Sequence, residues 1–157
     1  MPDFSRKRNR LHDYDYSTNN MYYVTICTRD KKCILCDSQE FSLTEIGKTV
    51  LDAINHIQNT YEGAIIDKFV IMPNHIHIMI LLTHCKSTLS NIISQMKRHA
   101  SIQSGEKIWQ KSFFDHIVRN EADYLRIWEY IEENPQKWKM DQYYPESRQN
   151  NDNLPAE

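Results

Sequence analysis

Two apolar segments separated by three residues constrain the fold of this chain more than any other feature. Residues 64–71 and 75–82 are rich in β-branched and other apolar side chains, which favours strands. Between them lie Met72, Pro73 and Asn74, and a proline removes one donor from any sheet ladder. A parallel crossover needs a much longer connection, so the two strands must form an antiparallel hairpin.

Strand and helix patterns alternate on both sides of this hairpin. Aromatic and β-branched residues predict a strand over Tyr22–Thr28, and alternation predicts another over Ser112–Val118. Apolar residues at helical spacing predict helices over Ser42–Thr60, Leu89–Ile102 and Glu121–Glu133. The order is therefore strand, helix, strand, strand, helix, strand, helix.

This order predicts an α+β protein with a ferredoxin-like split βαβ palm. Its four-stranded antiparallel sheet would carry two helices on one face. The extra C-terminal helix, which contains Tyr130, would lie on the other face, together with a functional site.

Polar residues mark the ends of the helices. We expect Ser42 and Glu45 to form a capping box at the start of the first helix. Asn120 can cap the last helix. Asn134 precedes Pro135, and because the residue before a proline avoids the α region, the last helix should end there.

The length of 157 residues fits one domain, which we place at 17–144. It would lie between a basic arm, 1–16, and a disordered tail, 145–157. The net charge of −2 means that a nucleic-acid partner must be argued from local charge. No apolar run approaches the roughly 20 residues of a membrane span, and no signal peptide is visible. We therefore expect a cytoplasmic protein whose four cysteines are thiols, with Cys33 and Cys36 an incidental pair.

A pair of histidines follows the hairpin turn, in the sequence PNHIHIM. Residues i and i+2 of a strand point to the same face, so His75 and His77 project side by side, about 6.5–7 Å apart at their Cα atoms. Two imidazoles at this separation can bind one divalent ion. The alternative is that both histidines lie on a solvated face of the sheet. A strand as apolar as this one would ordinarily carry Val or Ile at both positions, which favours the metal site. The ligands would suit magnesium, manganese or zinc, of which we expect magnesium or manganese.

The last predicted helix carries Tyr130 and Asn134 at i, i+4, so both lie on one helical face. If this helix covers the open face of the sheet, both residues can reach the histidine pair. Asn134 could then supply an oxygen as a third metal ligand, and Tyr130 could approach a phosphate. Taken alone, a tyrosine in a helix is more often a packing residue.

Three blocks in this order resemble one family. PNHIHIM resembles the His-hydrophobic-His motif of HUH-class nucleases, and DYSTNNMYYVTICT resembles the first strand of the same group. IWQKSFFDHIVRNEADYLRIWEYIEENPQKW resembles the C-terminal signature of REP-associated tyrosine transposases and of related insertion-sequence transposases. The resemblance spans Arg10 to Tyr144 and implies a ferredoxin-like HUH domain that cleaves single-stranded DNA near hairpins.

The resemblance also implies residue roles. His75 and His77 match the metal ligands, and Tyr130 matches the nucleophile that forms a 5′-phosphotyrosine link. Asn134 falls where related transposases carry a polar third ligand, often Gln, so this assignment is weaker. The implied partner is single-stranded or hairpin DNA in the nucleoid, and both a monomer and a homodimer are compatible with the family.

Basic and aromatic residues are candidates for DNA contact. Lys97 is the first choice for a phosphate, because its helix should flank the site. His116 could hydrogen-bond to a metal ligand or contact DNA, and a purely structural role is the alternative. Aromatic side chains could stack on bases, although core packing is the favoured alternative for them. The remaining candidates are Arg6, Arg8, Arg98, Lys107, Lys111, Arg119 and Arg126, with Trp109, Phe113 and Phe114 for stacking.

Two other functions remain open. One is a domesticated hairpin-binding protein without strand transfer. The other is a phosphodiesterase that uses metal-bound water. A zinc deaminase is disfavoured because its H-x-E and P-C-x-x-C motifs are missing.

Overall fold

Four strands form one antiparallel sheet, in the order β2-β3-β1-β4 across the sheet. The strands are β1 (Asn20–Cys27), β2 (Ala64–Ile71), β3 (His75–Leu82) and β4 (Phe114–Ile117). The hairpin of β2 and β3 has the predicted bounds, and the predicted α+β fold is confirmed.

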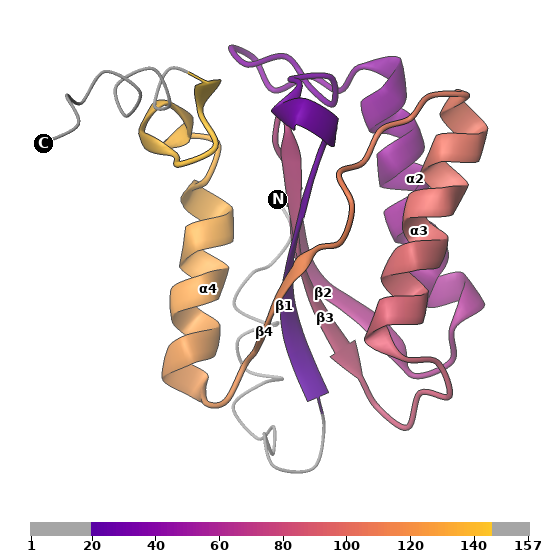
Figure 1. Ribbon diagram of the computed structural model, residues 1–157. Coiled ribbons are helices and arrows are strands. Elements are labelled where there is room, and N and C mark those ends of the chain that lie inside the picture. The colour runs from indigo at the N-terminus through magenta and orange to yellow at the C-terminus, as the bar shows by residue number, and fades with distance from the viewer. Residues whose placement is uncertain (1–19, 146–157) are drawn as a thin grey trace, which may run out of the picture.

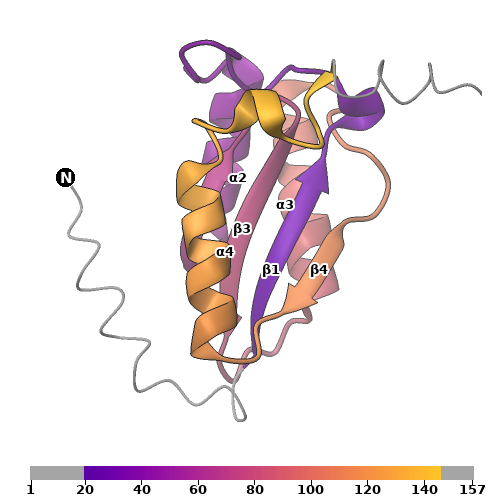
Figure 2. The same ribbon diagram turned by 90° about the vertical axis from the view of Figure 1, so that its left-hand side faces the viewer.

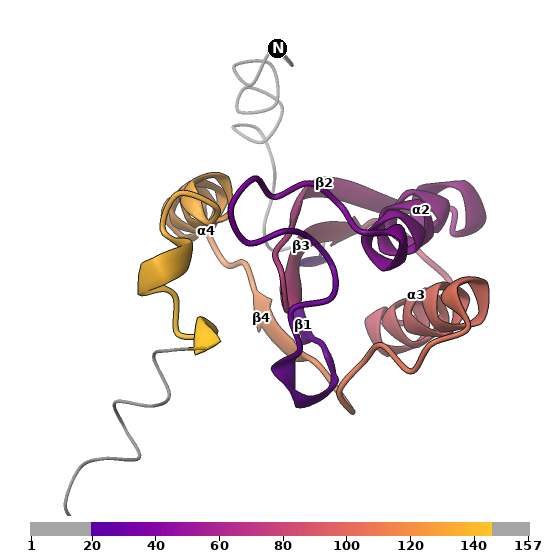
Figure 3. The ribbon, with the colours of Figure 1, turned by 90° about the horizontal axis from the view of Figure 1, so that it is seen from above.

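Within residues 20–145, three α-helices complete the layers of this computed structural model (Figures 1 and 3). Helices α2 (Glu45–Thr60) and α3 (Leu89–Ser104) cover one face of the sheet, and α4 (Glu121–Glu133) lies on the other. Two short 3₁₀ helices, η1 (Arg29–Lys31) and η2 (Trp138–Met140), follow β1 and α4. None of the helices between residues 20 and 145 is long and apolar enough to span a bilayer.

The structure describes residues 20–145. The predicted basic arm 1–16, with Arg6 and Arg8, lies outside the described residues. So does the predicted tail 145–157, except for Pro145.

The alternation of β3 divides the interior into two cores. Ile76, Ile78 and Ile80 pack against α2 and α3. Met79 packs toward α4, against Tyr124, Ile127, Trp128 and Ile131. The face with the smaller core is also the face toward which the two histidines point, so the histidine pair lies between the sheet and the C-terminal segment.

Polar contacts fix α4 on the sheet. Asn120 accepts a hydrogen bond from the backbone N–H of Asp123 at 2.8 Å, so it caps the helix as predicted. The hydroxyl of Tyr124 donates to the Oδ2 atom of Asp67 at 2.6 Å. Asp67 is the extra residue at a β-bulge in β2, and a bulge re-aims the side chain of such a residue. Lys68, the next residue, forms an ion pair with Glu132 near the other end of α4.

Two sequence predictions about helix ends were wrong in detail. The cap of α2 is Thr44 and not Ser42, because the Thr44 hydroxyl accepts from the N–H of Gly47 at 3.0 Å. Glu45 forms an ion pair with Lys48 instead of closing a capping box. Helix α4 does end at Glu133, but Asn134 keeps a right-handed helical backbone, with φ −55° and ψ −44°. The helix stops because Pro135 has no N–H with which to continue the hydrogen-bond ladder.

Candidate metal centre and active site

The rings of His75 and His77 lie side by side on β3, with centroids 4.7 Å apart. Their exposed fractions are 0% and 1%. The structure thus brings the predicted pair together on the α4 face, in a buried position rather than on a solvated sheet face.

The orientation of His75 is set by Asn74. The amide nitrogen of Asn74 donates to the carbonyl of Tyr143 at 2.7 Å and to that of Lys31 at 3.3 Å. Its Oδ1 atom therefore faces the Nδ1 atom of His75, at 2.8 Å. Because an amide oxygen can only accept, the Nδ1 of His75 must carry the proton. The lone pair of the imidazole then sits on Nε2.

His77 is held in a similar way by β1. The hydroxyl oxygens of Tyr23 and Thr25 each lie 2.9 Å from its Nδ1 atom. Either oxygen can accept the Nδ1 proton, which leaves Nε2 as the free ring nitrogen. Metal-bound histidines usually donate their second N–H to such a partner.

Burial keeps both imidazoles neutral. It lowers the pKa of His75 to about 3, although the nearby Asn134 side chain opposes the shift. Burial, together with the neighbouring His75, lowers the pKa of His77 well below its usual value. Neutral imidazole is the form that binds a metal ion.

Three buried acceptor atoms at this site have no hydrogen-bond partner among residues 20–145. They are the Nε2 atoms of His75 and His77 and the Oδ1 atom of Asn134. A buried polar group without a partner costs about 1–3 kcal/mol, so such a group calls for an explanation. Two imidazole nitrogens and one amide oxygen fit a divalent cation. Within the described range, no three His, Cys, Asp or Glu side chains form a metal-binding group, so an amide would have to complete the set.

Tyr130 borders the histidine pair from α4. Its ring centroid lies 5.4 Å from that of His77, and the residue is 41% exposed. Burial of the ring and the nearby Asp141 carboxylate raise the pKa of Tyr130, and the Asn134 side chain opposes the shift. The predicted nucleophile therefore lies next to one predicted ligand, His77, and is accessible to solvent.

Asp141 connects Tyr130 and Asn134. Its Oδ2 atom accepts a hydrogen bond from the amide nitrogen of Asn134 at 3.3 Å, and its carboxylate interacts with the Tyr130 side chain. The amide oxygen of Asn134 is thereby turned away from Asp141. Burial raises the pKa of Asp141.

The segment after α4 packs over His75. The ring of Tyr143 lies 4.5 Å from that of His75, and the ring of Trp138 lies 5.9 Å from it. The ammonium of Lys31 lies over the Tyr143 ring, 5.2 Å from its centre. The contacts of Trp138 and Tyr143 cover His75, whereas His77 is covered by Tyr23 and Tyr130.

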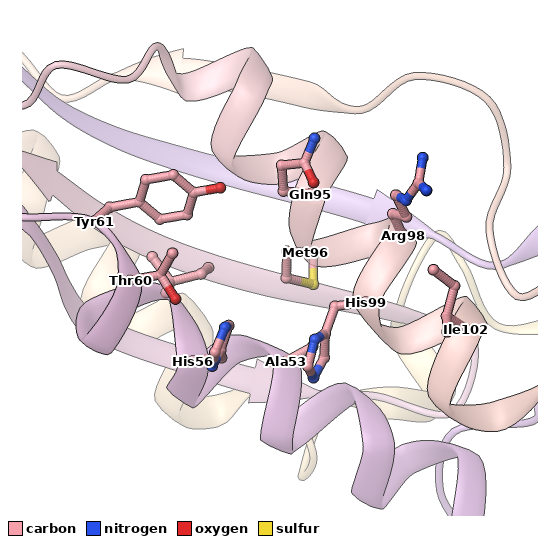
Figure 4. Close-up of a pocket in the computed structure, with 10 residues that line it drawn as sticks. Ala53, His56, Thr60, Tyr61, Gln95, Met96, Arg98, His99 and Ile102 are labelled. Carbon is pink, nitrogen blue, oxygen red and sulfur yellow. The ribbon is translucent and has the colours of Figure 1, made fainter.

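The expectation that the helix of Lys97 flanks the site was wrong. Helix α3 lies on the opposite face of the sheet (Figure 1). The ammonium of Lys97 donates to the carbonyls of Gln110 and Ser112, both at 2.9 Å. Arg98, also on α3, lines a hollow between α2 and α3 (Figure 4) together with the stacked rings of His56 and His99. Lys97 and Arg98 thus lie on the helix that covers the face of the sheet opposite to the histidine pair.

His116 contacts Asp123, whose Oδ2 atom lies 2.7 Å from the ring nitrogen Nε2. This contact joins β4 to the first turn of α4, away from the predicted ligands. Lys111 and Arg119 are exposed residues before and after β4.

Trp109 and Phe113 pack against the core under α2 and α3, whereas Phe114 is 67% exposed. Core packing thus explains two of the three aromatic candidates.

Sequence reasoning missed five side chains at the site. Two of them have a recognisable signal, because Thr25 is the register partner of His77 and Asn74 directly precedes His75. Tyr23 shares the face of β1 with Thr25. Asp141 and Tyr143 come from the segment after α4 and carry no local signal. The missed residues are Tyr23, Thr25, Asn74, Asp141 and Tyr143.

The four cysteines are thiols, as expected, and Cys33 is exposed while Cys36 is buried.

Known proteins similar to this chain include transposases. A REP-associated tyrosine transposase of Escherichia coli K12 is 33% identical over 73 residues, which is 46% of this chain and 44% of that protein. An uncharacterized protein of Haemophilus influenzae is 29% identical, over 88% of this chain and 93% of its own. No family model matches the chain.

The fold of this chain is also similar to that of a solved structure. It is described as a REP-associated tyrosine transposase bound to a REP hairpin, and it superposes with a TM-score of 0.63 at 24% identity. The match covers 80% of this chain and 72% of that one. The resemblance predicted from the three sequence blocks is thus confirmed, and the shared fold is established.

Proposed function

We propose that this protein is a metal-dependent single-stranded-DNA endonuclease and strand transferase, in which Tyr130 is the nucleophile. The observation that carries the proposal is the position of Tyr130, whose ring lies 5.4 Å from that of His77. Beside it are the three buried atoms without partners on His75, His77 and Asn134. The similarity to REP-associated tyrosine transposases supports the same reading.

A divalent ion, magnesium or manganese, would be held by the Nε2 atoms of His75 and His77 and the Oδ1 atom of Asn134. When bound, it would supply Lewis-acid stabilisation for the charge that develops on the scissile phosphate. Thr25, Tyr23 and Asn74 would fix the imidazoles from behind, so that little reorganisation is needed when the ion arrives.

Tyr130 attacks the phosphorus atom through its phenol oxygen. A bond forms between this oxygen and phosphorus, and the bond from phosphorus to the 3′ oxygen breaks. The phenol must lose its proton on or before attack, and Asp141, which interacts with Tyr130, is placed to receive it. The leaving 3′ oxygen gains a proton and becomes a hydroxyl.

The products are a 5′-phosphotyrosine link and a free 3′-hydroxyl. One phosphodiester replaces another of similar energy, so the strand can be resealed to a different end without ATP. A metal-bound water would instead hydrolyse the strand and lose this reversibility.

The substrate class that we propose is single-stranded DNA at hairpins, because the matched structure is described as bound to a REP hairpin. We place the protein in the cytoplasm, associated with the nucleoid. A homodimer remains a prediction from the family resemblance.

The test is incubation of the full chain with end-labelled hairpin DNA carrying single-stranded flanks, with magnesium or manganese. We expect a protein–DNA adduct that survives denaturation, and we expect Tyr130→Phe to abolish it. Tyr61→Phe, on the opposite face of the sheet, is the matched control and should leave the adduct intact. Cleavage that survives in Tyr130→Phe would indicate hydrolysis by water. Binding without cleavage in the wild type would indicate a DNA-binding protein.

A further inference from the structure

The row of residues that crosses the sheet at His77 leads to an exposed aromatic side chain. His77 on β3 pairs with Thr25 on β1, and Thr25 pairs with Phe114 on β4. Directly paired residues of antiparallel strands point to the same face, so Phe114 lies on the face of the histidine pair. Its side chain is 67% exposed.

Strand β4 is left open on this face by the described helices. Helix α4 lies toward the β2 and β3 side of the sheet, and β4 forms the opposite edge (Figure 2). A small hollow of about 110 Å³ lies beside Phe114, and Thr25, Cys27 and Lys111 also line it. An exposed ring next to a catalytic site offers a surface on which a nucleobase can stack.

Lys111 also lines a second and larger cleft, of about 800 Å³. The charged residues that line this cleft are four cations and a single carboxylate, Asp30. The cations are Arg29, Lys31, Lys107 and Lys111. Among residues 20–145, no ion pair joins any of the four cations to a carboxylate. The cleft therefore presents positive charge that is available to phosphates.

The walls of this cleft are fastened to each other. The N–H of Arg29 donates to the carbonyl of Ile108 at 2.8 Å, and that of Gln110 donates to the carbonyl of Cys27 at 3.0 Å. The two hydrogen bonds from Lys97 to the carbonyls of Gln110 and Ser112 hold the same loop from α3. Such a preorganised wall loses little conformational entropy when a ligand binds.

The cleft also adjoins the candidate metal centre. The ammonium of Lys31 lies 5.2 Å from the centre of the Tyr143 ring, which itself lies 4.5 Å from the ring of His75. The hollow beside Phe114 and the basic cleft thus form one path, joined at Lys111, along the edge of the sheet next to the site.

We propose that this path binds the single-stranded DNA next to the scissile phosphate, with a base stacked on Phe114 and backbone phosphates in the basic cleft. The inference rests on the proposed function and adds to it the residues that hold the strand. Positive grooves with aromatic side chains are the usual means of binding single strands.

The test measures binding without metal, so that it requires no cleavage. Full-length protein is titrated into a labelled oligothymidylate of about 12 nucleotides at several salt concentrations, and fluorescence anisotropy gives Kd. The basic variant is Arg29→Ala/Lys107→Ala/Lys111→Ala. We expect its Kd to rise at least ten-fold. The slope of log Kd against log salt should fall by about 2, since each phosphate contact of a single strand contributes about 0.7.

The matched control removes three exposed cations from other surfaces, in Lys48→Ala/Lys86→Ala/Lys137→Ala. It should leave Kd within two-fold of the wild type and the slope unchanged. Equal losses in both triple variants would overturn the proposal, because they would show a response to net charge alone. Wild-type affinity in the basic variant would overturn it as well, as would an equal loss of affinity for duplex DNA.

Phe114→Ala tests the stacking contact separately. We expect about a ten-fold loss of single-strand affinity, because one stacked base contributes about 1–3 kcal/mol, and Phe114→Trp should restore binding. Ile102→Ala, an equally exposed apolar position on α3, is the control. An unchanged Kd in Phe114→Ala would overturn this part. A wild-type protein that binds through the path but forms no adduct would instead count against the proposed nuclease function alone.

Discussion

The Oδ1 atom of Asn74 lies 2.8 Å from the Nδ1 atom of His75, and this contact decides which ring nitrogen faces the candidate metal centre. Two carbonyl acceptors hold the amide nitrogen of Asn74, so the amide cannot turn round without losing both hydrogen bonds. Asn74, in the turn between β2 and β3, therefore also fixes the orientation of the His75 ring.

Asn74→Ala should weaken metal binding without removing a ligand. Loss of a partner behind a metal-bound histidine typically costs 10- to 100-fold in affinity, so we expect a change of that order. Isothermal titration of the full chain with manganese measures it. Asn91→Ala, at an exposed position on α3, should bind as the wild type does, and equal affinities in both variants would contradict the role of Asn74.

The ligands themselves have a matched control within the chain. His75→Ala and His77→Ala should each abolish measurable manganese binding in the same titration. His56 and His99 also form a neighbouring pair, with ring centroids 4.9 Å apart, but they lie between α2 and α3. His56→Ala/His99→Ala should retain binding. A loss there, with His75→Ala unaffected, would move the metal site to the helix pair.

The fold was predictable because it depends on local patterns. The Met72-Pro73-Asn74 break fixed the hairpin, and helical periodicity located three helices to within a few residues. The start of α2 was missed because its cap depends on a tertiary contact, in which the Thr44 hydroxyl donates to the carbonyl of Ile34 at 2.6 Å. A sequence pattern cannot distinguish Ser42 from Thr44 without this contact.

The site was predictable where its residues share one element. The pair on β3 and the i, i+4 pair on α4 each follow from the geometry of that element. Asp141 and Tyr143 reach the site only because the chain turns back after Pro135, which no periodicity indicates. Lys97 was misplaced for a different reason, since the predicted layers already put its helix on the face of the sheet opposite to the site, as the structure does.

The buried histidines predict how stability changes with pH when metal is absent. The pKa of His75 is about 3 in the folded protein, against about 6.5 for an unperturbed histidine. The unfolded chain therefore binds more protons below about pH 6.5, and stability must fall as pH falls toward 3. Each such histidine contributes a slope of about 1.4 kcal/mol per pH unit within this window.

Denaturant unfolding between pH 4 and pH 5.5, in the presence of a chelator, measures this slope. His75→Gln should show a slope smaller than that of the wild type by about 1.4 kcal/mol per pH unit. Parallel stability curves for the two proteins would show that the imidazole does not carry the effect.

The contact that fastens α4 should matter for both stability and chemistry. The hydroxyl of the buried Tyr124 donates to Asp67 at 2.6 Å, and this hydrogen bond fixes the first turn of the helix that presents Tyr130. Tyr124→Phe removes a hydrogen bond to a charged group, so we expect a loss of about 1.5–3 kcal/mol in the free energy of unfolding. Adduct formation should also slow, because the phenol of Tyr130 would be held less well against His77. Tyr61→Phe, on the opposite face, should change neither the unfolding midpoint nor the rate. A destabilised Tyr124→Phe protein that forms the adduct at the wild-type rate would show that the position of α4 is set by the apolar contacts of Ile127, Trp128 and Ile131 instead.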